Sequence, residues 1–165
     1  ISGPTHLKAP RGVKRINIES AQEMLAATEE TLPADILICV AAVADWRTPH
    51  IEKQKIKKQT EQLPSLTLVE NPDILKIISN HQKHRPSLVI GFAAETEKLE
   101  QHALDKLRKK GCDWIIANDI SKDIMGGQSN QIHLITKDKT ETWPLLDKLD
   151  VARKLVLYIE TFFKN

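Results

Sequence analysis

The chain has 165 residues, of which 41% are hydrophobic and 28% are charged, and its formal net charge is +2. A chain of this length is expected to form one domain with a sizeable core, and its apolar content excludes intrinsic disorder. It contains no apolar run near the ~20 residues that cross a bilayer, and its small net charge disfavours a dedicated nucleic-acid binder. Both cysteines lack a CxxC neighbour, and the first residues do not form a secretory leader. We therefore expect a reduced, cytoplasmic protein with neither a membrane nor a nucleic acid as partner.

The first half of the chain predicts alternating strands and helices. Ser20 and Glu23 form a capping box that opens a helix, and Pro33 follows its end. Apolar residues alternate with polar ones before that helix, and a nearly continuous apolar run follows it, as in a strand covered on both faces. The expected elements are a loop over 2–12, a strand over 13–18, a helix over 20–30, a strand over 36–43 and a polar loop over 45–62.

The second half continues this alternation and ends with a hairpin and a helix. Asn71 is a favourable N-cap before Pro72, Gly111 supplies a helix stop, and Asp147 can cap the last helix. Strands that alternate with helices predict an α/β fold with a mainly parallel sheet. The expected elements are a short strand over 66–69, a helix from 71 up to the proline at 86, a strand over 88–93, a helix over 96–111, a strand over 112–117, a loop over 118–130, a hairpin of 132–136 with 140–143, and a helix after 147.

Three of the predicted strands end in an acidic residue. Ligands of open parallel sheets bind at the carboxyl ends of the strands, where Asp45, Glu95 and Asp119 are expected. Any strand can end in a polar residue, so none of the three is a site by itself. The small pairs Ala41-Ala42 and Ala93-Ala94 are equally compatible with a ligand that approaches the backbone and with close helix packing.

Lysines supply the positive charge that a phosphate group would need. The polar loop holds four of them, including those of Lys55-Ile56-Lys57-Lys58, and composition alone favours a solvated surface. Lys106 and Lys110 lie four residues apart and share a helix face. Convergence of Lys55 with these two would create a polyphosphate site, although the helix dipole explains Lys110 without a ligand. The sequence has no GxGxxG, Walker or HExxH motif, and we assign no metal ligand.

Five segments together resemble a known family. They are Ala41-Ala42-Val43-Ala44-Asp45-Trp46, Lys55-Ile56-Lys57-Lys58, Asn71-Pro72-Asp73-Ile74, Gly91-Phe92-Ala93-Ala94-Glu95-Thr96 and Ala117-Asn118-Asp119. In this order they closely resemble motifs of the bacterial phosphopantothenoylcysteine synthetases, which form the carboxyl-terminal half of a bifunctional coenzyme A biosynthesis protein. One such motif alone is weak, but five in order over most of the chain are specific.

The resemblance implies a fold and a reaction. The fold is a Rossmann-like, mainly parallel sheet with helices on both faces and a C-terminal antiparallel hairpin, and the hairpin is the candidate surface of a homodimer. The reaction joins 4′-phosphopantothenate to L-cysteine with CTP and Mg²⁺. The carboxylate attacks the α-phosphate and releases pyrophosphate, and the cysteine amine then displaces CMP. Because a carboxylate approaches a polyanion, cations are needed to offset the repulsion.

The resemblance also implies which residues contact the nucleotide. Lys55 would stabilise the reacting phosphate as the catalytic residue, and Lys106 and Lys110 would hold the triphosphate. The resemblance thus favours a functional role for the lysine run, which composition alone assigns to the surface. The remaining implied contacts are Cys39, Val40, Ala41, Asp45, Pro72, Asp73, Ile74, Leu75 and Phe92.

One part of the family pattern has no counterpart here. The synthetases open with a β-α unit that contains an Asn. Residues from Ile1-Ser2-Gly3-Pro4 onward resemble a later segment of the synthetases, so this unit has no counterpart here. We therefore expect residues 1–165 to form a single, N-terminally incomplete synthetase domain, without the upstream decarboxylase half that binds FMN. We do not expect this fragment to be fully active by itself. The alternative function is a nucleotide-binding α/β module without ligase activity. A dinucleotide oxidoreductase is a weaker third hypothesis, because the glycine fingerprint is missing.

Overall fold

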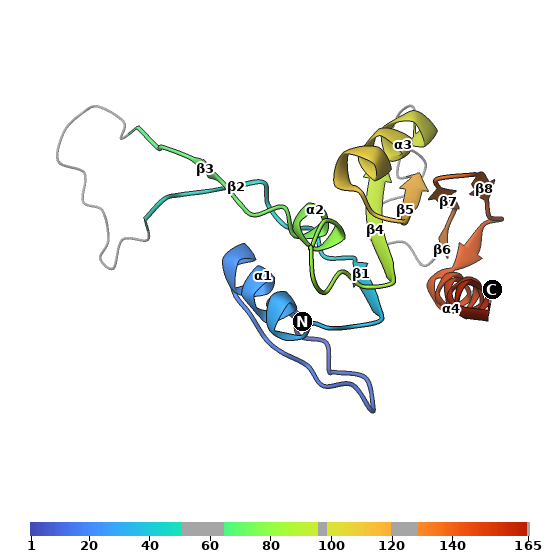
Figure 1. The fold of residues 1–165 in the computed structure, drawn as a ribbon, viewed down its shortest axis with the longest axis horizontal. Coiled ribbons are helices and arrows are strands. Elements are labelled where there is room, and N and C mark those ends of the chain that lie inside the picture. The colour runs from blue at the N-terminus through green and yellow to red at the C-terminus, as the bar shows by residue number, and fades with distance from the viewer. Residues whose placement is uncertain (51–64, 96–98, 120–128, 165) are drawn as a thin grey trace. The chain divides into compact units, whose positions relative to one another are not determined.

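The structure, a computed structural model, describes residues 1–50, 65–95, 99–119 and 129–164 (Figure 1). Its chain divides into two compact units, which are described separately. The first unit comprises Ile1–Thr31 and Ala41–Ile74, and the second unit comprises Leu32–Val40 and Leu75–Asn165. The expectation of a single domain stays a prediction.

The second unit is built on a five-stranded sheet with the strand order β1-β4-β5-β7-β8. Strands β1, β4 and β5 are parallel, whereas β7 and β8 continue the sheet as antiparallel strands. This sheet confirms the predicted mainly parallel α/β fold with its C-terminal antiparallel hairpin. The bounds are Ile36–Cys39 for β1, Leu88–Glu95 for β4, Trp114–Asp119 for β5, Ile132–Thr136 for β7 and Thr140–Thr142 for β8.

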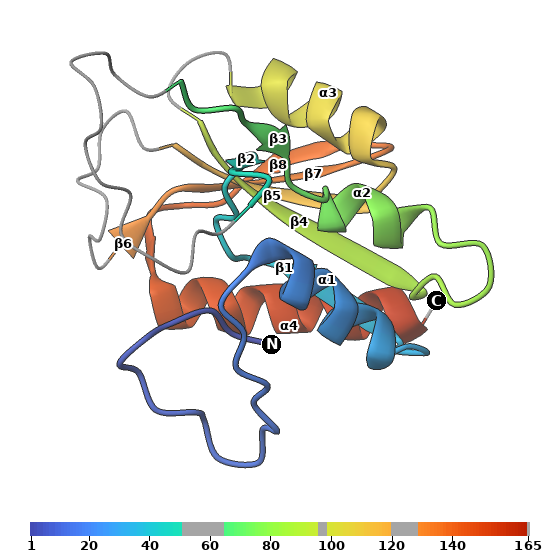
Figure 2. The same cartoon turned by 90° about the vertical axis from the view of Figure 1, so that its left-hand side faces the viewer.

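Helices cover both faces of this sheet. Because side chains alternate between the two sides of a strand, neighbouring residues of β4 enter different clusters. Val89 belongs to the same buried cluster as Leu107 of α3, whereas Ile90 belongs to the cluster that contains Leu155 of α4. Figure 2 shows α3 and α4 on opposite sides of the strands, which confirms the predicted layers. The bounds are Ile74–Ser79 for α2, Leu99–Lys110 for α3 and Lys148–Lys164 for α4.

A glycine in β4 accommodates the residue that α2 packs on the sheet. A Cβ atom at Gly91 would lie 2.6 Å from Leu75 Cδ2 and 2.9 Å from Ile115 Cδ1. Leu75 and Ile115 are both buried, and a side chain at Gly91 would require these terminal methyl groups to shift. The absence of a side chain at Gly91 therefore allows Leu75 to pack directly on the strand.

An ion pair fixes the amino ends of β4 and β5. Arg85 Nη2 donates to both carboxylate oxygens of Asp113, at 2.9 and 3.0 Å, and Asp113 Oδ2 also accepts from the main-chain N–H of Val89 at 2.7 Å. The other guanidinium nitrogens of Arg85 donate to the carbonyls of Ser79 and Pro86. The pair thus ties the segment after α2 to the start of the parallel ladder.

The first unit is held by local hydrogen bonds. Ser20 Oγ accepts from the N–H of Glu23 at 3.2 Å, and the Glu23 carboxylate accepts from the N–H of Glu19 at 2.8 Å. This second hydrogen bond lowers the pKa of the Glu23 carboxyl. The predicted Ser20 cap is confirmed, whereas the Glu23 carboxylate accepts from Glu19, the residue before the cap, and not from the N–H of Ser20 as in a regular capping box. The bounds are Ala21–Glu30 for α1, Trp46–Arg47 for β2 and Val69–Glu70 for β3, which pairs antiparallel with β2.

Three predicted strands differ in the structure. The strand predicted over 13–18 is wrong, because this segment makes a single bridge, from Asn17 to Ser2. The strand predicted over 36–43 ends at Cys39, where its register with β4 ends. Its predicted burial on both faces is also wrong, since Ile38 is 41% exposed and Val40, just beyond the strand, is 61% exposed. The strand predicted over 66–69 is displaced to β3, because the ladder with β2 begins at position 69.

Two predicted loops contain short strands, and one helix starts late. The loop over 45–62 includes β2, and the loop over 118–130 includes the end of β5 and β6 (Ser129–Asn130), which pairs with β9 (Leu146–Asp147). Strands of two residues leave no periodic pattern to read. The helix predicted from Asn71 begins at Ile74. The predictions over 51–62, 96–98 and 120–128 lie outside the described residues.

The ends of α3 and α4 agree with the prediction. Gly111 has φ of +74° and follows the last residue of α3. Asp147 Oδ1 accepts from the N–H of Asp150 at 2.7 Å and caps α4. Within the described ranges, no helix combines the length and the apolar content that a membrane span requires.

Candidate functional site

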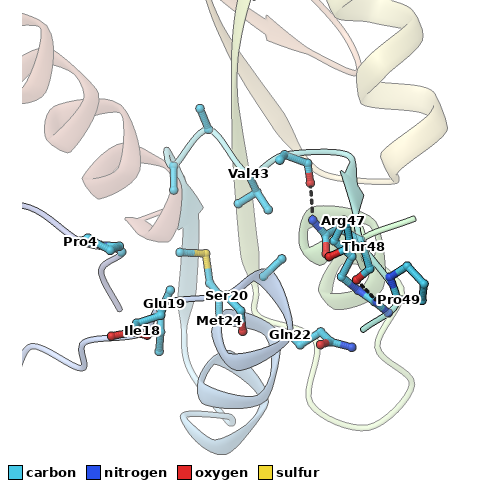
Figure 3. Close-up of a pocket in the computed structure, with 16 residues that line it drawn as sticks. Pro4, Ile18, Glu19, Ser20, Gln22, Met24, Val43, Arg47, Thr48 and Pro49 are labelled. Atoms are coloured by element: carbon cyan, nitrogen blue, oxygen red, sulfur yellow. Dashed lines mark hydrogen bonds between the residues drawn. The ribbon is translucent and has the colours of Figure 1, made fainter. Parts of the chain in front are cut away.

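The first unit contains an open pocket of about 470 Å³ (Figure 3). One wall is the loop over 41–44, which consists of three alanines and a valine, and another wall is the beginning of α1 with Ser20 and Met24. Because alanine side chains are small, a ligand in this pocket can approach the main chain of the loop. The remaining lining residues are Gly3, Pro4, Ile18, Glu19, Ala21, Gln22, Arg47, Thr48, Pro49 and Asn71.

Asn71 fixes the small-residue wall of the pocket. Its Nδ2 donates to the carbonyl of Ala44 at 2.8 Å, and its main-chain N–H donates to the carbonyl of Asp45 at 2.7 Å. The prediction that Asn71 caps a helix is wrong, because its side-chain amide is engaged with the loop and the helix starts three residues later. The NPDI motif therefore positions the AAVAD motif within the first unit.

The pocket carries one group of each charge. Arg47 is the only cationic residue among its lining residues, and Glu19 is the only acidic one. Figure 3 shows Arg47 beside Thr48, across the pocket from Glu19. Such a lining is compatible with an organic anion that also presents apolar groups to the alanines.

In the second unit, α3 brings one predicted site residue to the carboxyl halves of the parallel strands, which carry others. Cys39 of β1 is in register with Gly91 of β4, and Ala94 of β4 is in register with Asn118 of β5. Lys106 of α3 reaches this part of the sheet, where its Nζ donates to the carbonyl of Phe92 at 3.2 Å. The structure thus places Lys106 and Phe92, both predicted nucleotide contacts, within hydrogen-bonding distance.

Lys110 occupies a different place along α3. It is the last residue of the helix, about 6 Å beyond Lys106 along the helix axis. Its carbonyl accepts from Asn80 Nδ2 at 3.0 Å, and β5 begins only at Trp114, four residues on. Its main chain therefore lies toward the amino ends of the strands, and the structure joins Lys106, but not Lys110, to Phe92.

The other predicted contacts lie in varied surroundings. Ile74 and Leu75 are buried, so their side chains serve packing. Val40, Ala41 and Asp45 are exposed, whereas Cys39, Pro72, Asp73 and Phe92 are half-buried. The predicted catalytic residue, Lys55, lies outside the described residues. The members in the first unit are Ala41, Asp45, Pro72, Asp73 and Ile74, and those in the second unit are Cys39, Val40, Leu75, Phe92, Lys106 and Lys110.

The thiols and acidic residues set limits on the chemistry. Neither Cys39 nor Cys112 forms a disulfide, and burial raises the pKa of the Cys112 thiol to about 11. Cys112 is therefore a neutral thiol near pH 7 and a poor nucleophile. In the part of the chain that the structure describes, no group of three His, Cys, Asp or Glu side chains is arranged to hold a metal ion.

Sequence reasoning missed the polar residues of the pocket. The sequence predicts Ser20 and Asn71 only as helix caps and places Arg47 in the polar loop over 45–62 without a role of its own. The pocket forms from segments up to about 70 residues apart, so the sequence around each of these residues does not indicate the pocket. Their proximity in sequence to recognised motifs is the one signal that could have found them.

Comparison with known proteins identifies close relatives of the whole chain. Residues 1–162 match the family described as the DNA/pantothenate metabolism flavoprotein C-terminal domain. The chain is 40% identical over 158 residues to the coenzyme A biosynthesis bifunctional protein CoaBC of Haemophilus influenzae and 41% identical over 162 residues to that of Escherichia coli. These alignments cover 94% and 95% of the chain but 39% of each relative. The chain thus spans about two fifths of the length of these curated relatives.

Solved structures share the fold. A crystal structure of the C-terminal domain of CoaBC has a TM-score of 0.78 and 34% identity, covering 98% of this chain and 72% of that chain. A Cab2 mutant in complex with phosphopantothenate-cysteine has a TM-score of 0.65 and 14% identity, covering 90% of this chain and 53% of that chain. At such low identity, the second likeness shows the fold alone.

Proposed function

This chain belongs to the DNA/pantothenate metabolism flavoprotein C-terminal domain family, and we propose that it acts as the phosphopantothenate–cysteine ligase part of a CoaBC-type protein. The five motifs predicted this family, and the match over residues 1–162 confirms it. Two further facts support the proposed substrates. The curated relatives are named as bifunctional coenzyme A biosynthesis proteins, and Cab2 was solved with a compound that joins phosphopantothenate to cysteine.

The proposed reaction forms an amide in two steps. The carboxylate of 4′-phosphopantothenate attacks the α-phosphate of CTP, a new P–O bond forms, and pyrophosphate leaves. The neutral amine of L-cysteine then attacks the acyl carbon of the acyl-cytidylate, loses a proton and displaces CMP. The first step brings two anions together, so positioned cations lower its barrier.

One observation carries the nucleotide part of the proposal, namely the hydrogen bond from Lys106 Nζ to the carbonyl of Phe92. It holds an ammonium group at the carboxyl half of a parallel strand, where ligands of open α/β sheets bind. A lysine ammonium has three N–H donors, so this contact leaves two for phosphate oxygens. Lys106 is thus oriented by the strand before a nucleotide arrives, which reduces the ordering cost of binding.

The pocket of the first unit is the proposed site of the pantothenate substrate. Its wall over 41–44 is apolar and of small residues, and its cationic residue is Arg47. Phosphopantothenate has an apolar dimethyl group and two anionic ends, so both features suit it.

Magnesium enters the proposal as the Mg²⁺ complex of CTP. Mg²⁺ in phosphoryl-transfer sites is commonly bound by one or two carboxylates together with substrate phosphates. The described residues hold no three-ligand cluster that would retain the ion without the nucleotide.

The test of the reaction is release of pyrophosphate by the purified chain. We expect release with CTP, Mg²⁺, 4′-phosphopantothenate and L-cysteine together, and much less when ATP replaces CTP. Escherichia coli CoaBC is the positive control. CTP binding without pyrophosphate release by this chain would reject the ligase in favour of the nucleotide-binding module. The homodimer through the β7–β8 hairpin stays a prediction, which sedimentation of the same sample tests.

A charge-removal series tests the lysines. We expect Lys106→Gln and Lys55→Gln to weaken CTP binding about tenfold, because each removes a charge-assisted contact to phosphate. Lys109→Gln is the matched control, since Lys109 is an exposed lysine of the same helix. Isothermal titration of each variant with CTP and Mg²⁺ measures the effect. An unchanged Kd in either variant would remove that lysine from the site.

A further inference from the structure

The guanidinium of Arg47 is poorly satisfied by the chain itself. Its hydrogen bond runs from Nη1 to the carbonyl of Thr48, the next residue, at 3.5 Å, which is the limit of such a contact. Its Nε is buried without a hydrogen-bond partner. No ion pair joins Arg47 to a carboxylate of the described residues. Since buried donors are almost always paired, this guanidinium has unused capacity.

The backbone holds Arg47 at a defined place on the pocket. Strand β2 pairs Arg47 with Val69 and Trp46 with Glu70 of β3. The loop that precedes β2 is tied to Asn71, which directly follows β3. The two-pair ladder of β2 with β3 and the adjacent hydrogen bonds of Asn71 therefore fix both Arg47 and the small-residue wall over 41–44.

In the ranges that the structure describes, no acidic side chain forms an ion pair with this guanidinium. Glu19 lines the same pocket, but its main-chain N–H donates to Glu23, and Figure 3 shows its side chain across the pocket from Arg47. The Glu23 carboxylate in turn accepts from Glu19 and belongs to the cap of α1. Arginine presents a planar fork of donors that matches the oxygens of a carboxylate or a phosphate.

From these observations we propose that Arg47 is an anion-binding residue of the pocket, where its guanidinium takes an anionic end of the acidic substrate. This assignment rests on the proposed function and adds a substrate contact that the family motifs did not supply. The group that Arg47 binds is an oxyanion with at least two free oxygens. Phosphopantothenate has two such groups, the carboxylate and the phosphate, and ligands that lack one of them distinguish the two.

The experiment is isothermal titration of the chain with three ligands. These are 4′-phosphopantothenate, pantothenate, which lacks the phosphate, and 4′-phosphopantetheine, which lacks the carboxylate. We expect Arg47→Met to raise the Kd for phosphopantothenate about tenfold or more, and Arg47→Lys to raise it less. Arg11→Met is the matched control, because Arg11 is an exposed arginine of the first unit outside the pocket lining.

The two truncated ligands identify the anion. A weakened Kd for pantothenate with unchanged phosphopantetheine binding assigns Arg47 to the carboxylate, and the reverse pattern assigns it to the phosphate. Unchanged Kd values for all three ligands in Arg47→Met overturn the assignment while the ligase proposal stands, provided pyrophosphate is still released. A wild-type chain that binds none of the three overturns both.

A measurement on the unmodified side chain covers the case in which Arg47→Met does not fold. In NMR spectra, the arginine Nε–H resonance that is present in the wild-type chain and absent in Arg47→Lys belongs to Arg47. We expect this resonance to shift during titration with phosphopantothenate. A resonance that stays in place while the ligand binds would overturn the assignment.

Discussion

Different interactions stabilise the two units of the molecule. Nearly all buried apolar residues of the described chain belong to the second unit, and only Ala27 and Ile74 belong to the first. The first unit relies instead on hydrogen bonds such as those of the Ser20 cap and of Asn71 to the loop over 41–44. Regions with few buried apolar contacts open more readily than a core does. We therefore expect the first unit, which contains the pocket, to open more readily than the second unit.

The largest expected effect comes from removing a core residue of the second unit. Trp143 is fully buried, with its ring 5.4 Å from that of Tyr158 and 4.8 Å from Lys154 Nζ. We expect Trp143→Ala to lower the free energy of unfolding by about 3–5 kcal/mol, because it leaves a large cavity. Urea denaturation followed by circular dichroism measures this change.

Trp46→Ala is the matched control in the first unit. Trp46 is 55% exposed, so we expect its removal to cost less than about 1 kcal/mol. Equal losses in the two variants would show that burial does not distinguish the units.

The cap of α1 tests whether the first unit opens by itself. Ser20→Ala removes the acceptor of the Glu23 N–H and is expected to cost about 1 kcal/mol. Hydrogen exchange should then be about fivefold faster at the amides of α1 and unchanged at those of α3. Ser20→Asp is the control that preserves a capping oxygen. Equal acceleration in both helices would mean that the two units open together.

The smallest expected effect is a pH-dependent one in the second unit. The Tyr158 hydroxyl donates to the Glu141 carboxylate, which lowers the pKa of Glu141 and raises the pKa of Tyr158. A lowered carboxyl pKa stabilises the folded state above the unfolded value of about 4.3, and this contribution is lost as pH falls through the folded pKa. The raised pKa of Tyr158 acts in the opposite range, since its contribution is present below about pH 10 and is lost as pH rises through the folded pKa.

Tyr158→Phe measures this contribution, because it keeps the ring and deletes the donor. We expect a loss of less than about 1 kcal/mol at pH 7, since both residues are only half-buried and solvent screens their interaction. The difference from wild type should shrink as pH falls below about 4.3. Unfolding curves from pH 3 to pH 7 test this, and a difference that does not change with pH would contradict it.

The sequence by itself determined the family, and it determined those helix ends and strands that depend on neighbouring residues. The Ser20 cap, the Gly111 stop and the Asp147 cap depend on residues within a few positions, so their patterns could be read directly. The buried strands β4 and β5 were evident from their apolar runs. The five motifs identified the family; one of them contains Phe92, and the resemblance to the family added Lys106 as a second nucleotide contact.

The tertiary structure alone decided which candidate residues meet. The sequence predicts Asn71 as a helix cap, but its side-chain amide donates to the carbonyl of Ala44, 27 residues away, because the fold brings this carbonyl near. Lys106 and Lys110 share a helix face, but only Lys106 bonds the carbonyl of Phe92 in β4, since α3 carries Lys110 toward the other end of the strands. The pairing of β2 with β3 positions Arg47 at the pocket, and a ladder of only two residue pairs has no periodic pattern in the sequence. Long-range pairing, rather than local propensity, assigned these roles.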